Sequence, residues 1–453
     1  MRVHFIAIGG SAMHNLAIAL HLKGDQVTGS DDAVFDPSKS RLEKYNLLPA
    51  EMGWNADRIT KDLEAVILGM HAKADNPELL KAKELGLNIF SYPEYLFEQA
   101  KLKSRVVIGG SHGKTTITSM ILHVLHYHNK DVDYMVGAQL EGFEVMVKLT
   151  RENDFMVLEG DEYLSSPIDL RPKFHLYKPN IALISGIAWD HINVFKTLED
   201  YEKQFEIFID QITPGGVLIY NEEDATVKRL AEGSENQIRK IPYQTPEYSI
   251  QDGETLIETS EGQLPLEIFG AHNLNNLAGA KWVCQNMGID EDDFYEAIAT
   301  FKGASKRLEK IAETFNSTAF KDFAHSPSKV SATTKAVKNQ FPERKLVACL
   351  ELHTYSSLNP EFLAQYKGAL NAADEPVVFY SPEALKIKKM APIRKDQIKE
   401  AFNNGNLTIF TEPKAFKDYL FAQNFKNKTL LLMSSGNYGG LDFEEVGNLV
   451  NIG

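Results

Sequence analysis

A glycine-rich turn followed by Lys-Thr-Thr carries the clearest chemistry in the sequence. The run Arg105-Val-Val-Ile-Gly-Gly-Ser-His-Gly-Lys-Thr-Thr116 begins as a β-branched strand and leads into an apolar-periodic helix. This order predicts a phosphate-binding loop, in which backbone N–H groups and the helix N-terminus hold anionic oxygens. Lys114 would reach the terminal phosphates, and the Thr115 hydroxyl would meet Mg²⁺. Only two residues separate Gly110 and Gly113, fewer than the four of the usual phosphate-loop pattern. The alternative interpretation is a tight strand-to-helix turn with a surface lysine.

Two later strands are followed by side chains of types that can bind metals. The segment 154–158 leads into Glu159-Gly-Asp-Glu162, and the segment 181–185 leads towards His191. Ligands of open α/β sheets bind beyond the carboxyl ends of the strands, and Mg²⁺ prefers oxygen ligands shared with substrate phosphates. We therefore expect Glu162 and His191 to hold metal beside the phosphate loop. The alternatives are a solvated loop acid and a structural histidine.

The N-terminus contains a second candidate nucleotide-binding turn. A strand at 3–8, the turn Gly9-Gly10-Ser11, a helix and a strand ending at Asp31 form a βαβ start. The third glycine of the dinucleotide fingerprint is missing, because His14 stands near its place. The pattern predicts a nucleotide at this turn. An ordinary NAD site and a purely structural turn stay open as alternatives.

The remaining chain alternates strands and helices, which predicts an α/β protein of three domains. The expected domains are residues 1–103, 104–301 and 302–453. Short strands with turns at 241–269 predict a small antiparallel insertion in the mostly parallel central sheet. Asn273 and Asn276 follow, three residues apart on one helical face, where their amides could read a base edge or cap the helix.

Composition narrows the class of protein. The 453 residues carry a net charge of −14, which argues against a nucleic-acid partner. The two cysteines, Cys284 and Cys349, lie outside any Cys-x-x-Cys or Cys/His cluster, so neither a disulfide framework nor a zinc site is expected. No apolar run approaches the roughly 20 residues of a membrane span, and the first residues read as a strand, not as a signal peptide. We expect a cytoplasmic enzyme.

Six motifs in order resemble those of the Mur ligases, ATP-dependent enzymes that form amide bonds in peptidoglycan synthesis. They lie at residues 110–116, 159–162, 190–191, 272–276, 306–309 and 322–327. The resemblance covers essentially the whole chain. It implies a Rossmann-like UDP-sugar domain, a central P-loop ATPase-type domain and a C-terminal Rossmann-like domain that binds the incoming amino acid or peptide.

The resemblance also implies roles for individual residues. The ATP phosphates would be held by Gly110, Ser111, His112, Gly113, Lys114, Thr115 and Thr116. The adenine would meet Asn273 and Asn276, the ribose Asp322, and the phosphates also His325 and, on domain closure, Arg307. Mg²⁺ would be held by Thr115, Glu162 and His191, and the UDP moiety by Gly10, Ser11, Asp31 and the loop at His71. Lys114, His191 and Arg307 would be the catalytic residues.

The N-terminal part is similar to the family members that use UDP-N-acetylmuramate. These take as the amine either L-alanine, in de novo synthesis, or the murein tripeptide L-alanyl-γ-D-glutamyl-meso-diaminopimelate, in recycling. Tyr163, the stretch 189–195 and the stretch 433–440 favour the tripeptide. Ser326 stands where a second histidine is usual, and Glu351-Leu-His-Thr-Tyr-Ser356 partly resembles the L-alanine-adding members. We expect a tripeptide ligase and keep an L-alanine ligase as the alternative.

Two other classes compete with this interpretation. A dehydrogenase would use the first βαβ unit and a nicotinamide, and the phosphate loop would then be idle. A nucleotide-binding regulator would bind ATP without turnover. A carbamylated lysine found in several Mur ligases has no clear counterpart, although Lys203 is nearby. We expect a monomer or a weak homodimer.

Overall fold

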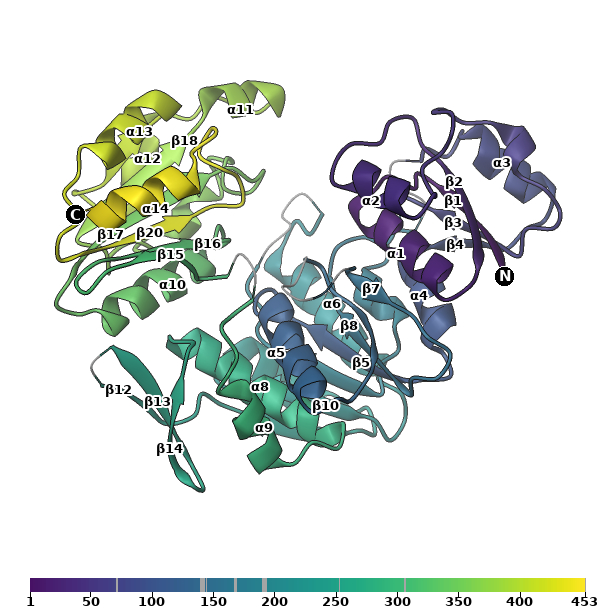
Figure 1. Cartoon of the computed structure of the whole chain (residues 1–453), viewed down its shortest axis with the longest axis horizontal. Coiled ribbons are helices and arrows are strands. Elements are labelled where there is room, and N and C mark those ends of the chain that lie inside the picture. Colours follow the sequence, from purple (N-terminus) through teal and green to yellow (C-terminus); the bar gives the residue numbers. More distant parts are fainter. Residues whose placement is uncertain are drawn as a thin grey trace. The chain divides into compact units, whose positions relative to one another are not determined.

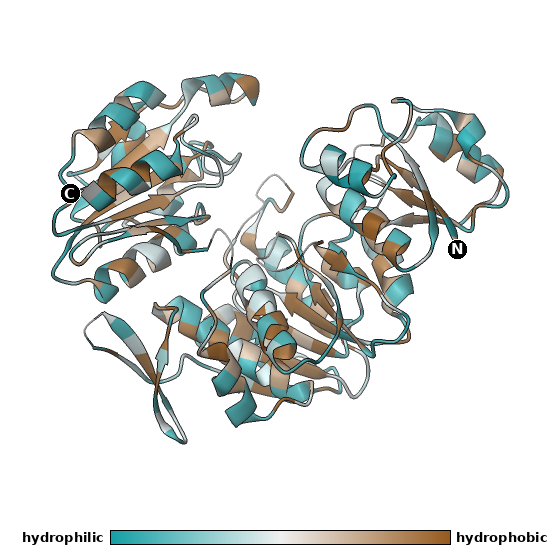
Figure 2. Ribbon diagram, viewed as in Figure 1, coloured by the Kyte–Doolittle hydropathy of each residue, from teal (hydrophilic) through white to brown (hydrophobic). Residues whose placement is uncertain are grey.

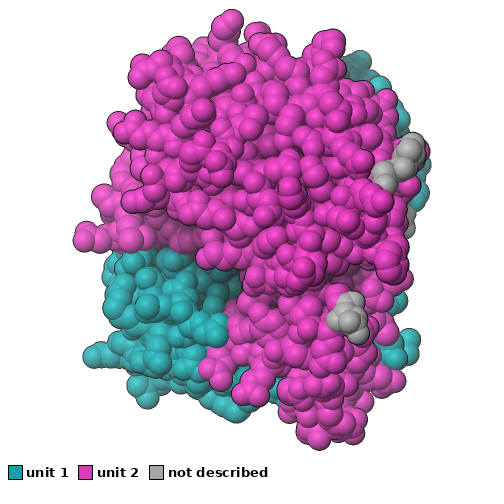
Figure 3. Space-filling view, turned by 90° about the vertical axis from the view of Figure 1, so that its left-hand side faces the viewer, with its two compact units in different colours: residues 1–187, 202–243, 279–290 teal, residues 188–201, 244–278, 291–453 magenta. Residues whose placement is uncertain are grey.

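The computed structural model describes the whole chain except residues 71, 139–142, 144, 167–168, 190–193, 252, 305–306 and 453. The described residues form four sheets (Figure 1) and divide into two compact units (Figure 3). Unit 1 comprises Met1–Ile187, Glu202–Tyr243 and Gly279–Asp290, and unit 2 comprises Ala188–Tyr201, Gln244–Ala278 and Glu291–Gly453. The three expected domain boundaries stay a prediction.

The first sheet of unit 1 is parallel and has the strand order β2-β1-β3-β4. Its strands are β1 (Arg2–Ile6), β2 (Gln26–Ser30), β3 (Ala65–Leu68) and β4 (Ile89–Ser91). Its helices are α1 (Ser11–Leu22), α2 (Ser38–Lys44), α3 (Pro77–Glu84) and α4 (Tyr92–Ala100). The expected strand–turn–helix–strand start is present, with Gly9 and Gly10 in the turn after β1.

The second sheet of unit 1 has the order β11-β10-β9-β5-β8-β6-β7, and only β7 runs antiparallel to its neighbour. Its strands are β5 (Ser104–Gly109), β6 (Asp133–Met135), β7 (Val147–Lys148), β8 (Phe155–Glu159), β9 (Ile181–Ile184), β10 (Val217–Asn221) and β11 (Arg239–Tyr243). Unit 1 also contains α5 (Lys114–Tyr127) and α7 (Ala225–Gly233). The helices α6 (Leu198–Asp210) and α8 (Ala271–Asn286) begin in unit 2 and end in unit 1, and α9 (Glu291–Ile298) belongs to unit 2. β5 lies in the middle of the sheet, so the turn that follows it is central to the carboxyl edge.

The antiparallel insertion exists but is shorter than expected. It consists of β12 (Tyr248–Gln251), β13 (Glu254–Thr259) and β14 (Gly262–Leu266). The expected range began at residue 241, but β11 pairs in parallel with β10 and extends the large sheet instead. Within unit 2, the Gln340 amide donates to the Gly253 carbonyl at 2.6 Å and accepts from the Thr255 hydroxyl at 3.0 Å, which joins the insertion to the helix that carries Gln340.

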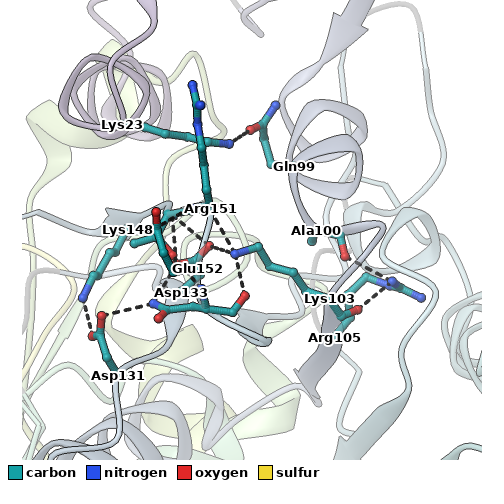
Figure 4. Close-up of polar contacts among 12 residues, drawn as sticks. Lys23, Gln99, Ala100, Lys103, Arg105, Asp131, Asp133, Lys148, Arg151 and Glu152 are labelled. Atoms are coloured by element: carbon teal, nitrogen blue, oxygen red, sulfur yellow. Dashed lines mark hydrogen bonds and ion pairs between the residues drawn. The ribbon is translucent and has the colours of Figure 1, made fainter.

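A polar network surrounds the link between α4 and β5 in unit 1 (Figure 4). The Lys103 ammonium donates to the Asp133 carboxylate at 2.7 Å and to the Thr150 carbonyl at 3.1 Å. The Arg105 guanidinium donates to the Ala100 carbonyl at 3.2 Å, at the end of α4. Because the last carbonyls of a helix lack partners within it, this cation completes the helix end and fixes the link into β5.

The sheet of unit 2 has the order β15-β16-β20-β17-β18-β19, and only β15 is antiparallel. Its strands are β15 (Glu309–Glu313), β16 (Thr318–Asp322), β17 (Lys345–Leu352), β18 (Glu375–Tyr380), β19 (Thr408–Phe410) and β20 (Lys428–Met433). Its helices are α10 (Pro327–Gln340), α11 (Pro382–Ile387), α12 (Lys395–Phe402), α13 (Pro413–Phe421) and α14 (Phe443–Ile452). Alternate residues of β17 enter two cores, one shared with α10 and α12 and the other with α13 and α14.

The inner strands of the parallel sheets are predominantly hydrophobic (Figure 2), as expected for parallel sheets that are covered on both faces. The expected α/β class, with mostly parallel sheets and a small antiparallel part, is thereby confirmed. Among the described residues, none of the helices combines the length and hydropathy that a membrane span requires.

Candidate active site

The glycine-rich turn lies where it was predicted, between the end of β5 and the start of α5. Gly110 has φ = 130° and Gly113 has φ = 78°, in the region that favours glycine. A Cβ atom at Gly110 would overlap the Ser185 hydroxyl. Gly113 caps α5, and the first-turn N–H groups of that helix have no partners within it. The turn therefore presents helix-end donors at the centre of the carboxyl edge.

The end of β9 holds the turn in place. The Ser185 hydroxyl donates to the carbonyls of His112 and, at 3.3 Å, of Gly109. The Ser111 N–H donates to the Gly186 carbonyl at 2.9 Å. A Cβ atom at Gly186 would lie 2.5 Å from the His112 ring, so glycine is needed there for the ring to fit. The predicted loop is thus braced from the neighbouring strand.

Lys114 is a partly buried cation with a carboxylate partner. Its ammonium lies 2.5 Å from the Glu162 carboxylate and donates to the Gly110 carbonyl at 2.6 Å. Burial by itself lowers the pKa of Lys114, but the charges of Glu162 and Asp161 outweigh it, and the net pKa is raised. Asp161 in turn lies 2.5 Å from Lys173. Lys114 is therefore fully charged at neutral pH, as contact with a terminal phosphate requires.

Thr115 contacts a different carboxylate. Its hydroxyl donates to one oxygen of Glu159 at 2.7 Å, and the other oxygen accepts from the Gly137 N–H at 2.7 Å. Glu159 is the last residue of β8, whereas Glu162 lies in the loop beyond. A threonine hydroxyl beside buried carboxylate oxygens fits the oxygen ligand set of Mg²⁺. Sequence reasoning missed Glu159, although its place at a strand's carboxyl end was the available signal.

Two predicted residues, His191 and His71, lie outside the described part of the chain. The segment that leads to His191 is anchored at Ile187, whose N–H donates to Asp224 at 2.9 Å. Within the described residues, no group of three or more His, Cys, Asp or Glu side chains is placed to hold a metal ion. The metal assignments of Thr115, Glu162 and His191 stay predictions.

The residues predicted to hold the UDP moiety lie at the carboxyl edge of the first sheet. Gly10 caps α1, and Ser11 is exposed in its first turn. The Asp31 carboxylate accepts from the N–H groups of Gly9 at 2.7 Å and Asp32 at 2.9 Å. Burial raises the pKa of Asp31, which those two hydrogen bonds oppose. Asp31 therefore holds the glycine turn through one oxygen and the backbone of its own neighbour through the other.

In unit 2 the structure brings Arg307, Asp322 and His325 together at the end of β16. The Asp322 carboxylate accepts from the N–H groups of Leu308 and Ala324, each at 2.5 Å, although burial raises its pKa. The Arg307 guanidinium lies 4.7 Å from the centre of the Phe323 ring, and the His325 and Phe323 rings are 5.1 Å apart. Asp322 thus fixes the backbone next to Arg307 and next to His325.

The two predicted adenine-binding asparagines begin α8. Asn273 donates through its amide to the Phe269 carbonyl at 3.0 Å, and Asn276 is buried. This bond is not a helix cap, in which the side-chain oxygen would accept from a first-turn N–H group, so the base-reading role and the capping alternative both stay predictions.

A second polar cluster lies at the carboxyl edge of β17 and β20. The buried Glu351 carboxylate accepts from the Ser434 hydroxyl and from the Tyr438 N–H at 2.8 Å, and it lies 3.7 Å from the His353 ring. A Cβ atom at Gly436 would lie 2.8 Å from Glu351 and 3.0 Å from His353. Sequence reasoning noted both stretches separately, but only the strand order places β20 beside β17. We name these five residues the acceptor edge.

Comparison with known proteins agrees with this arrangement. Residues 108–284 match the Mur ligase middle domain, and residues 2–104 match the Mur ligase family, catalytic domain. The UDP-N-acetylmuramate–L-alanine ligase of Sulfurihydrogenibium sp. strain YO3AOP1 is 31% identical over 83% of this chain and 82% of its own length. The UDP-N-acetylmuramate–L-alanyl-γ-D-glutamyl-meso-2,6-diaminoheptandioate ligase of Escherichia coli K12 is 28% identical over 97% of this chain and 96% of its own.

A solved structure shows the same fold. The UDP-N-acetylmuramate–alanine ligase of Thermotoga maritima superimposes with a TM-score of 0.69 at 21% identity, covering 100% of this chain and 98% of that one. The phosphate loop lies within residues 108–284, the range that matches the Mur ligase middle domain. The chain belongs to the Mur ligase family and is an ATP-dependent ligase.

Proposed function

We propose that the chain joins the tripeptide L-alanyl-γ-D-glutamyl-meso-diaminopimelate to UDP-N-acetylmuramate and cleaves ATP to ADP and phosphate. A carboxylate oxygen of the sugar bonds to the γ-phosphorus, and the bond from that phosphorus to ADP breaks. The tripeptide's amine then attacks the carbonyl carbon of the acyl phosphate, phosphate leaves, and the amine loses a proton. The protein's task is to neutralise and position anions that repel each other.

Lys114 and the turn around it support the activating half of this reaction. The cation lies at the N-terminus of α5 and would exchange part of its contact with Glu162 for the terminal phosphates. Thr115, with Glu159 or Glu162, would hold Mg²⁺, which would supply positive charge between the γ-phosphate and the sugar carboxylate. His191 remains the predicted ligand of a second Mg²⁺.

The other assignments follow the family resemblance. We assign Arg307 and His325 to the phosphates, Asp322 to the ribose, and Asn273 and Asn276 to the adenine. The UDP moiety is assigned to Gly10, Ser11, Asp31 and the loop at His71. Gly10 and Ser11 begin α1, and a helix N-terminus favours a diphosphate.

The observation that carries the choice of the tripeptide is the way the loop 434–440 is built into the acceptor edge. This loop is the stretch that resembles the tripeptide-adding members. Its Tyr438 hydroxyl donates to the carbonyls of Cys349 at 2.7 Å and Met433 at 2.8 Å, and its Tyr438 N–H donates to Glu351. The loop is therefore hydrogen-bonded into the sheet edge at which we expect the acceptor amine to bind.

L-Alanine is the second candidate acceptor. The turn that contains His353 and Tyr355 partly resembles the L-alanine-adding members, and the Sulfurihydrogenibium relative carries the name of an L-alanine ligase. This candidate predicts high activity with the free amino acid and none with the peptide.

One assay tests the proposal. ADP release is measured with UDP-N-acetylmuramate and either the tripeptide or L-alanine, and the product mass is determined. We expect kcat/KM for the tripeptide to exceed that for L-alanine by at least about 100-fold, or roughly 2.7 kcal/mol. A preference for L-alanine would overturn the tripeptide assignment. If neither acceptor gave any ADP release, both assignments would be wrong.

A further inference from the structure

Four basic residues follow β18 in unit 2: Lys388, Lys389, Arg394 and Lys395. We name them the cationic rim. They stand out in a chain whose net charge is −14. Lys388 is half-buried, and the other three are exposed. The rim occupies the end of α11, the loop that follows it and the first residue of α12.

The rim lies at the same sheet edge as Glu351 and His353. The Tyr380 hydroxyl, at the carboxyl end of β18, donates to the Ile393 carbonyl at 2.8 Å. Ile393 and Leu385 are buried in one core with Leu352, the last residue of β17. Because β17 and β18 are parallel neighbours, the segment that carries the rim starts beside the acceptor edge.

An aromatic contact links the rim to the turn after β17. The Lys388 ammonium lies 4.4 Å from the centre of the Tyr355 ring. That turn is rigid, since the Thr354 N–H donates to the Ser357 hydroxyl at 2.9 Å and the Ser357 N–H donates to the Thr354 hydroxyl at 3.1 Å. Tyr355, which follows His353 by two residues in the chain, therefore orients Lys388 through this contact.

Among the described residues, no carboxylate lies within ion-pair distance of any of the four cations. Lys386, which precedes the rim, is instead 4.0 Å from Glu383. Four cations gathered beside a ligand edge without counter-charges create a positive potential that favours an anionic ligand.

We infer that the cationic rim binds the carboxylates at the far end of the acceptor peptide. This inference rests on the proposed function. The tripeptide carries a carboxylate on its second residue and two on its third, whereas L-alanine has only the one beside the reacting amine. Lysine and arginine form short, charge-assisted hydrogen bonds with such carboxylates. The rim thus selects for acceptors that extend beyond the first amino acid.

Two double variants test the rim, Lys388→Gln with Lys389→Gln, and Arg394→Gln with Lys395→Gln. The control is Lys426→Gln, an exposed lysine that precedes β20 at the opposite edge of the sheet. We expect at least one double variant to raise KM for the tripeptide by about tenfold or more, with kcat within about twofold, since a tenfold change is only about 1.4 kcal/mol. The dipeptide L-alanyl-D-glutamate, which lacks both carboxylates of the third residue and ends in the free γ-carboxylate of glutamate, should lose much less. A double variant with Lys388→Arg and Lys389→Arg, which keeps both charges, should keep the wild-type KM.

The outcomes separate this inference from the proposed function. If the wild-type protein ligates the tripeptide and both double variants keep its KM, the rim inference is wrong and the function stands. An equal rise in KM for tripeptide and dipeptide would also overturn it, because the far carboxylates would not be the ligand. If the wild-type protein ligates only L-alanine, the function fails and the rim inference fails with it.

Discussion

Lys114 and Thr115 are neighbours in the chain but contact different carboxylates. Successive side chains of a helix point about 100° apart, so the first turn of α5 sends the ammonium to Glu162 and the hydroxyl to Glu159. The two acids stand three residues apart at the end of β8. The site therefore divides its carboxylates between a cation and a candidate metal ligand.

Removal of the Lys114 charge is expected to stop ATP turnover. We expect Lys114→Ala to lower ADP release by at least about 10³-fold, because the developing phosphate charge loses its main cation. It also removes the ammonium that faces the buried Glu162 carboxylate, which we expect to cost roughly 3 kcal/mol of stability. Lys114→Ala combined with Glu162→Gln should recover thermal stability without recovering turnover. UDP-sugar binding, followed by calorimetry, should survive in both, and turnover within tenfold of wild type would disprove the role.

The two carboxylates are expected to differ in their effect on magnesium dependence. We expect Glu159→Gln to raise the Mg²⁺ concentration for half-maximal ADP release by about tenfold or more, because Glu159 is the partner of Thr115. Glu162→Gln should change it less and should instead alter KM for ATP. A magnesium titration of ADP release by both variants measures this difference. A larger effect of Glu162→Gln than of Glu159→Gln would show that Glu162 is the magnesium ligand.

Residue types were easier to predict from the sequence than residue partners. The phosphate loop was recognisable because glycines, Lys114 and Thr115 follow a β-branched strand. Which of Glu159 and Glu162 contacts Thr115 depends on where β8 ends and on the direction in which α5 starts. The local spacing of residues in the sequence predicts neither. The acceptor edge was hidden for a similar reason, since Glu351 and Ser434 are 83 residues apart.

At the scale of elements, the strand directions of parallel neighbours were the hardest to foresee. The segment Arg239–Tyr243 has turn residues on both sides and was grouped with the antiparallel insertion that follows. It is parallel because β10 offers an open edge to it, a property of the sheet and not of the segment. The alternation of strands and helices, in contrast, is a local pattern and was sufficient for the fold class.

The junction network of unit 1 makes a prediction at this scale. Lys103→Met would remove the ammonium that pairs with the fully buried Asp133, which would keep its hydrogen bonds from Thr150 and Asn153, and we expect a loss of roughly 3 kcal/mol in the stability of unit 1. The matched control is Lys101→Met, whose ion pair with Glu98 is exposed and should cost no more than about 1 kcal/mol. Thermal unfolding of the two variants measures the difference. Equal losses would show that the Lys103–Asp133 pair contributes no more to stability than an exposed ion pair.

At the scale of the whole molecule, each compact unit has its own internal reporter. Cys284 lies in unit 1 and Cys349 in unit 2, and both are completely buried. Burial raises the pKa of both thiols, so neither should react with an alkylating reagent in the native protein at pH 8. Pulsed alkylation at increasing urea concentrations, with each cysteine quantified by mass spectrometry, should give two different midpoints. Coincident midpoints would mean that the units unfold as one.

The most direct test of the central claim follows one oxygen atom. UDP-N-acetylmuramate with an ¹⁸O-labelled carboxylate is incubated with ATP, Mg²⁺ and the tripeptide, and the released phosphate is analysed by mass spectrometry. Activation of the carboxylate through an acyl phosphate predicts one ¹⁸O in each phosphate released, together with one peptide bond formed. Unlabelled phosphate, or labelled phosphate without a ligated product, would contradict the account.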